Sequence, residues 1–242
     1  MAKLPTQYQD LGDVKLAYRE RGAGQALILL HGNSESKSIF SAYQQVHFNG
    51  FRTIAVDSRG HGETISNDAS YSIRQYSEDV IQLCRAKSIA RAAVIGYSDG
   101  GNIALFLASK EPKIFTKIVA ISPNYLASGI TGGIQWINQA GAKLLRALER
   151  LGLPTRKAIL RTNLDLDDIG ITASELSSIQ TSLHIIYAEH DLIKEEHLRE
   201  IGRLVPGSTL KKIARCNHIN ILDKPETIAD IRSYLLSEDS LD

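Results

Sequence analysis

Short apolar runs alternate along this chain with longer segments in which apolar residues recur every three or four positions. The two clearest runs, at residues 26–30 and 92–95, are apolar at nearly every position, as strands covered on both faces are. Such alternation is typical of βαβ units and predicts an α/β fold, a mostly parallel sheet with helices on both faces. The predicted strands are residues 15–19, 26–30, 53–56, 92–95, 117–121, 183–187 and 209–213.

The helical segments fall between these runs. Residues 72–75 (Ser-Ile-Arg-Gln) match a capping box, which predicts a helix that runs to about residue 87. A second helix is expected over 100–110, where Pro112 stops it. A last amphipathic helix is expected over about 225–236.

Residues 124–180 break this rhythm, because they contain no convincing strand. A second capping-box pattern starts at Thr172. We therefore divide the chain into an α/β core, 1–123 and 181–242, and a helical cap insertion, 124–180. Within the insertion, apolar residues recur at helical spacing at Ile134, Ile137, Leu144, Leu145, Leu148 and Leu151.

Two interpretations of the insertion remain open. Its helices can simply cover the sheet, or they can form a cap over a substrate pocket. The cap is favoured because the insertion follows the strand at 117–121, and loops at the carboxyl ends of parallel strands line the ligand crevice. Since its best helix is amphipathic, we expect the apolar face of that helix to be used in packing, which leaves a small closed pocket.

The composition narrows the possible partners. The net charge is +1, so we expect no general attraction to nucleic acid or to an anionic membrane. No basic cluster with interleaved aromatic residues occurs, which argues against nucleic-acid binding. The polar start predicts no signal peptide, and no run approaches the roughly 18 apolar residues of a membrane span.

The chain has two cysteines, Cys84 and Cys216. They lie too far apart in the sequence for a metal knuckle or a redox CxxC pair. We interpret them as reduced, buried thiols and not as a disulfide. This interpretation predicts a cytoplasmic protein, while the oligomeric state cannot be inferred.

Candidate chemistry begins with the segment GYSDG at 96–100, which matches the pattern G-x-S-x-G. An apolar strand precedes it and a predicted helix follows it. In this setting a tight turn presents the hydroxyl of Ser98 at the edge of the sheet, so we favour Ser98 as a nucleophile. The flanking glycines are expected because a Cβ there would clash with neighbouring elements. The alternative is a glycine-rich loop whose serine only caps the helix.

Two loops can supply an oxyanion hole. Because Ser98 lies at the start of a helix, the unpaired N–H of Asp99 can donate to an oxyanion at the attacked carbonyl. The loop HGNSES, residues 31–36, follows another apolar strand. Its most suitable second donor is the N–H of Asn33.

A serine hydroxyl needs a base, and the base needs an acid that orients it. In this type of fold the chain order is Ser, then Asp or Glu, then His. The strand at 183–187 is followed by Glu189 and Asp191, and the strand at 209–213 is followed by His218. We favour Asp191 over Glu189 because it lies further into the loop, and we assign His218 as the base.

The other histidines receive no catalytic assignment. His190 precedes the expected position of the base and is assigned to the loop. His31 is the exception to follow, because it can help shape the oxyanion loop. The remaining histidines are expected at the surface or in packing: His47, His61, His184 and His197.

Two other polar segments are interpreted as structural. The loop DSRGHGET, residues 57–64, is expected to support the site, and Asp57 and Arg59 can pair to brace it. The segment from Asp165 superficially resembles a calcium loop, but Ile169 stands where an oxygen ligand is required. We interpret it as a solvated acidic turn, and we expect no metal.

The segments HGNSES, DSRGHGET, GYSDGG, EHD and CNHIN look like the ordered landmarks of the α/β-hydrolase superfamily. The resemblance covers almost the whole chain and implies about eight mostly parallel strands, a cap domain and no cofactor. One small departure is Thr64, where many relatives carry Ser. Branches of this superfamily with Asp or Cys as nucleophile are excluded by Ser98.

The GYSDGG segment is similar to that of biphenyl-hydrolase-like esterases, in which the Asp after the Ser helps bind the amino group of the substrate. Asp99 matches that position. The alternative is that Asp99 forms an internal salt bridge or caps its own helix.

These residues predict a serine hydrolase that cleaves small carboxylic esters through an acyl-enzyme, with a small-molecule ester as its only expected partner. The same triad can instead carry out lactone opening, acyl transfer or carbon–carbon cleavage, which the sequence does not separate. A low-turnover small-molecule receptor on the same fold is a further alternative. The complete set of triad residues argues against it.

Overall fold

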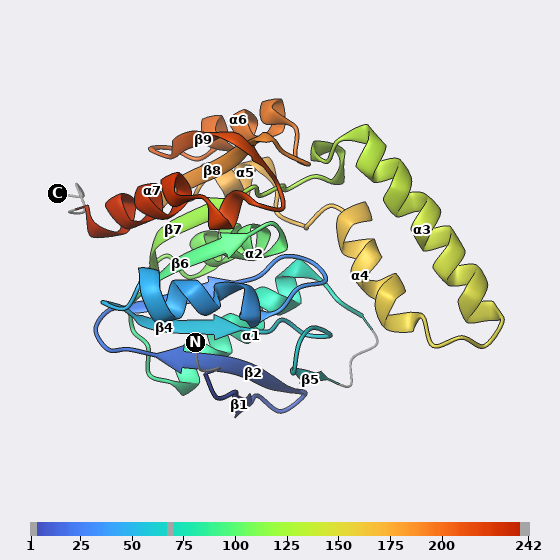
Figure 1. The fold of residues 1–242 in the computed structure, drawn as a ribbon, viewed down its shortest axis with the longest axis horizontal. Helices are drawn as coiled ribbons and strands as arrows, with labels where there is room; N and C mark the ends of the chain where they lie inside the picture. The colour runs from blue at the N-terminus through green and yellow to red at the C-terminus, as the bar shows by residue number, and fades with distance from the viewer. Residues whose placement is uncertain (1–3, 67–69, 238–242) are drawn as a thin grey trace.

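The computed structural model describes residues 4–66 and 70–237. They form one nine-stranded sheet in the order β1-β2-β4-β3-β6-β7-β8-β9, with β5 beside β2 (Figure 1). From β4 to β9 neighbouring strands are parallel, whereas β2 runs antiparallel to β1, β4 and β5. The strands are β1 (Gln7–Asp10), β2 (Val14–Arg21), β3 (Ala26–Leu30), β4 (Arg52–Val56), β5 (Ile65–Ser66), β6 (Ala92–Tyr97), β7 (Phe115–Ile121), β8 (Ser182–His190) and β9 (Thr209–Asn217).

The predicted α/β class with a mostly parallel sheet is confirmed, and each predicted strand forms. The edge strands β1 and β5 were not expected, because the first is polar and the second has only two residues. Strands β8 and β9 run further than predicted, to His190 and Asn217. They therefore end directly before the proposed acid, Asp191, and the proposed base, His218.

Helices cover both faces of the sheet (Figure 1). Successive residues of a strand point to opposite faces. Ile28 therefore joins a core beneath α1, α2 and α6, while Leu29 joins a core beneath α7 and three short helical turns. Helix α2 begins at Asp99, one residue before the predicted start. The elements are α1 (Ile73–Ala86), α2 (Asp99–Lys110), α6 (Glu195–Leu204), α7 (Pro225–Leu236), η1 (Lys37–Phe40), η2 (Tyr43–His47) and η4 (Ile221–Asp223).

The segment between β7 and β8 contains α3 (Gly132–Arg150), α4 (Arg156–Leu166), α5 (Ala173–Ser177) and the turn η3 (Ala127–Gly129). Helices α3 and α4 lie against each other and project from the carboxyl-end side of the sheet (Figure 1). Thr172 begins α5 with the complete capping box that the sequence predicted. None of the helices in the described ranges is long and apolar enough to cross a membrane.

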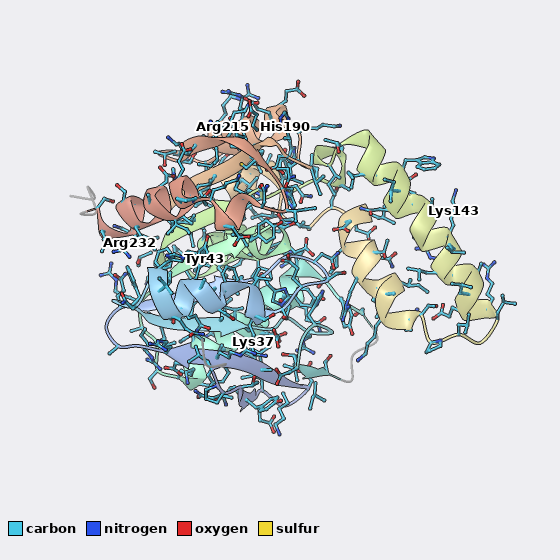
Figure 2. The ribbon with its side chains drawn as sticks, in the orientation of Figure 1. Lys37, Tyr43, Lys143, His190, Arg215 and Arg232 are labelled. Carbon is cyan, nitrogen blue, oxygen red and sulfur yellow. The ribbon has the colours of Figure 1, made fainter. Side chains whose placement is uncertain are left out.

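The expectation that α3 uses its apolar face in packing holds only in part, since Ile134 packs against the core while much of the remaining face is exposed. Only Ala142 of this helix is buried. Trp136 is 70% exposed and Leu144 is 61% exposed, and Leu151, directly after the helix, is 79% exposed. Figure 2 shows Lys143 of this helix well away from the sheet. The reason is geometric, because α3 extends beyond the core and contacts mainly α4.

Candidate active site

The turn between β6 and α2 holds Ser98 in a strained backbone conformation. Its φ is 53° and its ψ is −117°, a region that non-glycine residues rarely adopt. A Cβ at Gly96 would lie 2.0 Å from the carbonyl oxygen of Gly100, and a Cβ at Gly100 would lie 2.0 Å from that of Leu30. Both glycines are therefore required for the close approach of the turn to its neighbours, as the sequence predicted.

The three residues assigned as nucleophile, base and acid lie together at the carboxyl ends of β6, β8 and β9. The Nε2 atom of His218 is 3.2 Å from Ser98 Oγ. Its Nδ1 atom is 2.7 Å from Asp191 Oδ1. The backbone of the base is anchored as well, because Tyr97 donates its hydroxyl to the carbonyl of His218 at 2.7 Å.

Asp191 is the acid that contacts the base, and Glu189 is not. The side chain of Asp191 is only 3% exposed. Burial raises its pKa, but hydrogen bonds from His218 and Ser122 and the charge of His218 outweigh that and lower it overall. Glu189 is exposed and accepts instead from the N–H of Arg215. His190 is exposed at the periphery of the molecule (Figure 2).

The loop after β3 lies beside the nucleophile, since a Cβ at Gly32 would be 3.1 Å from Ser98 Cβ. Ser34 has a φ of 60° and donates its N–H to His61 Nε2 at 3.1 Å. The side chain of Asn33 donates to the carbonyl of Arg161 on α4 at 2.8 Å. Among the described residues, none accepts a hydrogen bond from the N–H of Asn33 or of Asp99.

Two buried histidines, His31 and His61, connect this loop to the loop at 57–64. His31 Nε2 accepts the N–H of Ser58 at 3.1 Å, and His61 accepts that of Ser34. Burial lowers the pKa of both rings, that of His61 to about 3, so both stay neutral and can accept through Nε2. His31 was expected to help shape the loop, whereas His61 was assigned to surface or packing. Its role depends on a contact with Ser34, far away in the sequence.

The loop at 57–64 is braced, but not by the expected pair. Asp57 binds the buried Lys37 at 2.5 Å. Arg59 binds Asp79 at 2.6 Å and Asp13 at 2.8 Å. The pairing of Asp57 with Arg59 is therefore wrong, because each side chain has an oppositely charged partner from a distant part of the chain.

A cavity of about 270 Å³ opens beside Ser98. Its polar wall contains Asp99, Glu35 and Asp165, and no lysine or arginine is among its described lining residues. The apolar part of the wall is formed by Ile130, Ile134, Leu192, Ile193 and Ile219. The wall therefore combines an apolar side with a group of carboxyl side chains.

Asp99 is buried and its Oδ2 atom has no hydrogen-bond partner. Its Oδ1 atom accepts from the side chain of Asn102 at 3.3 Å. No described residue forms an ion pair with Asp99, so the expected alternative of an internal salt bridge is wrong. Burial, reinforced by the nearby carboxyl of Asp165, raises the pKa of Asp99 to about 8.

Two further carboxyl groups of the site were missed in the sequence. Asp165 is part of α4 and not of a solvated turn, and burial raises its pKa. Glu35 accepts the N–H of Gly32 at 3.0 Å, and burial raises its pKa as well. The described residues hold no cluster of three or more His, Cys, Asp or Glu that fits a metal ion.

A family model described as alpha/beta hydrolase fold matches residues 25–150. A 2-(acetamidomethylene)succinate hydrolase from Mesorhizobium japonicum is 28% identical over 58% of this chain and 51% of its own length. Three mycobacterial relatives are each matched over 36% of their length, so the chain spans about half or less of the first relatives it matches. The human serine hydrolase BPHL is 27% identical over 85% of this chain and 77% of its own length.

Solved structures share the fold. The structure of an E-2-(acetamidomethylene)succinate hydrolase has a TM-score of 0.81 and 19% identity, covering 97% of this chain and 100% of its own. Est816, described as an N-acyl homoserine lactone degrading enzyme, has a TM-score of 0.76 and 23% identity, covering 94% and 100%. At this identity the likeness supports the fold and not a substrate.

Proposed function

Because this chain belongs to the alpha/beta hydrolase fold family, we propose that it is a serine hydrolase that cleaves small carboxylic esters through an acyl-enzyme. The supporting observation is the continuous chain of contacts from Ser98 Oγ through the ring of His218 to Asp191. Such a chain activates a hydroxyl that is otherwise a weak nucleophile.

In the proposed reaction Ser98 Oγ attacks the ester carbonyl carbon while His218 Nε2 takes the hydroxyl proton. Asp191 stabilises the imidazolium that forms. The oxyanion accepts from the free N–H groups of Asn33 and Asp99. His218 then gives its proton to the leaving alkoxide, which departs as the alcohol. Water attacks the acyl-enzyme while its proton passes to His218. The tetrahedral intermediate then collapses as His218 returns that proton to Ser98 Oγ, which releases the acid and restores the free enzyme.

We further propose that Asp99 binds the substrate and favours esters that carry an amino group. The buried, unpartnered Oδ2 atom of Asp99 and the absence of a cation in the described cavity wall support this assignment. An ammonium group in the cavity would supply the missing partner and favour the ionised carboxylate.

We also propose that residues 124–180 act as a cap. Asn138 of α3 and Asp165 of α4 are part of the cavity wall, and Asn33 binds the backbone of α4.

We propose, finally, that the protein is cytoplasmic and binds neither nucleic acid nor membrane. Its two cysteines are free and buried, in agreement with a reducing compartment.

The test is a panel of p-nitrophenyl esters of graded chain length, together with a lactone and a carbon–carbon cleavage substrate. We expect turnover of the short esters and a single fluorophosphonate adduct, located on Ser98 by mass spectrometry. Ser98→Ala should remove both while its circular dichroism spectrum stays unchanged. An adduct on another residue would refute the assignment of Ser98 as the nucleophile. A wild type that shows neither a burst of p-nitrophenol release nor steady turnover would indicate a receptor.

A further inference from the structure

Ser122 is a completely buried serine directly after β7, the strand between β6 and β8. It therefore lies between the strand that leads to Ser98 and the strand that leads to Asp191. Its φ is 52°, in the left-handed region that favours glycine. It is not part of the cavity wall.

The backbone N–H and the side-chain hydroxyl of Ser122 each donate a hydrogen bond. Its N–H donates to the carbonyl of Ile186 on β8 at 2.8 Å. Its Oγ donates to Asp191 Oδ2 at 2.5 Å. The other oxygen of that carboxylate faces His218, so the two oxygens of Asp191 serve different partners.

A glycine would adopt this backbone conformation without strain. A serine at this position is strained, and what it has that glycine lacks is the hydroxymethyl side chain. That side chain makes a charge-assisted hydrogen bond to a buried carboxylate. Without it, Oδ2 would keep only the N–H of Ala188, at 2.9 Å, as a donor. A buried carboxylate oxygen that loses a donor is strongly penalised.

On this geometry we propose that Ser122 is a positioning residue of the active site, whose hydroxyl holds the Asp191 carboxylate in the orientation that presents Oδ1 to His218. The proposal rests on the proposed serine-hydrolase function. Ser122 acts through Asp191 and does not touch the substrate. Its hydrogen bond also contributes, after those of His218, to the lowered pKa of Asp191.

The first test is Ser122→Gly, which removes the hydroxyl and relieves the left-handed strain. We expect a melting temperature close to that of the wild type, because the relief of backbone strain offsets the loss of the buried hydrogen bond. We expect kcat for a p-nitrophenyl ester to fall by about tenfold or more, with KM unchanged, since a buried hydrogen bond to a charge is lost.

The pH profile separates positioning from a structural role. The acidic limb of kcat/KM reports protonation of the base, His218. A carboxylate that is no longer held toward His218 stabilises the imidazolium less, so the acidic limb should move to lower pH in Ser122→Gly. Ser122→Ala also lacks the hydroxyl but keeps the strain. It should melt at a lower temperature than Ser122→Gly and show the same loss in kcat and the same displaced limb.

Ser88 provides a matched control, because it is exposed and has the same φ of 52° beyond the end of α1. Ser88→Gly should leave kcat and the acidic limb unchanged. If Ser122→Gly keeps the kcat and acidic limb of the wild type, the proposal is wrong while the hydrolase function stands. If the wild type neither cleaves esters nor is labelled at Ser98, the proposed function itself fails.

Discussion

Asp99, beside the nucleophile, and Asp165, on α4, place two carboxyl groups on one cavity without a nearby lysine or arginine in its described wall. Burial and their mutual repulsion raise the pKa of Asp99 to about 8. At neutral pH this carboxyl is therefore mostly protonated. Two buried carboxyl groups without a cationic partner lower the stability of the fold unless a ligand interacts with them. We therefore begin the tests of substrate specificity with this pair.

The first prediction concerns substrate choice. The wild type should have a higher kcat/KM for an amino-acid ester than for its N-acetylated form, by about tenfold or more, because only the free ammonium attracts a buried carboxylate. Asp99→Asn should lose this preference while it still cleaves the acetylated ester. A wild type without the preference, or a mutant that keeps it, would show that Asp99 does not select the substrate.

The second prediction concerns stability and pH. The pKa of Asp99 is about 8 in the folded protein and near 3.8 in the unfolded chain, so between these values the folded state binds more protons. The free energy of unfolding must then decrease as pH rises, by at most about 1.4 kcal/mol per pH unit from this group. Thermal melts from pH 5 to pH 8.5 should show the decrease in the wild type and a weaker one in Asp99→Asn. Equal slopes in both proteins would contradict it.

The third prediction compares two acids that lie two positions apart in the sequence, Asp191 and Glu189. Asp191→Asn should lower kcat by about 10⁴-fold, because the imidazole loses the partner that fixes its tautomer. Glu189→Gln is the matched control, and it should change kcat little, since Glu189 is exposed and its side chain accepts from the N–H of Arg215 instead of His218. The reverse order of the two effects would make Glu189 the acid.

The fourth prediction concerns substrate size. A cavity of about 270 Å³ accommodates a short acyl group and little more. For p-nitrophenyl esters, kcat/KM should therefore be highest at two to four acyl carbons, roughly, and fall with longer chains. Activity that rises steadily toward long acyl chains would mean that α3 and α4 open a larger groove.

Local sequence patterns were sufficient for the strands and for the order of the loops that bring Ser98, Asp191 and His218 into contact. The apolar runs of β3 and β6 reflect burial on both faces, and the glycines around Ser98 reflect a steric requirement of one turn. Each of these signals lies within a few residues of the feature that it predicts. The weakly patterned parts, such as the polar edge strand β1, carry no comparable signal.

The missed residues have long-range partners. Ser122 donates to Asp191, 69 positions away, and His61 accepts from Ser34, 27 positions away. Asp165 faces the cavity only because α4 folds back over the loop that contains Asn33. Ion pairs behave in the same way, because the nearest acid to Arg59 in the sequence is Asp57, while the fold supplies Asp79 and Asp13.

The attachment of α4 to the oxyanion loop has a consequence for protein engineering. The carbonyl of Arg161 holds the side chain of Asn33, and its guanidinium donates to the carbonyl of Gly60. A single residue thus joins the insertion to both loops beside the nucleophile. An insertion grafted from another hydrolase to change specificity would disconnect these loops unless it reproduced that junction. A modular exchange here should therefore retain Arg161 and its contacts with Asn33 and Gly60.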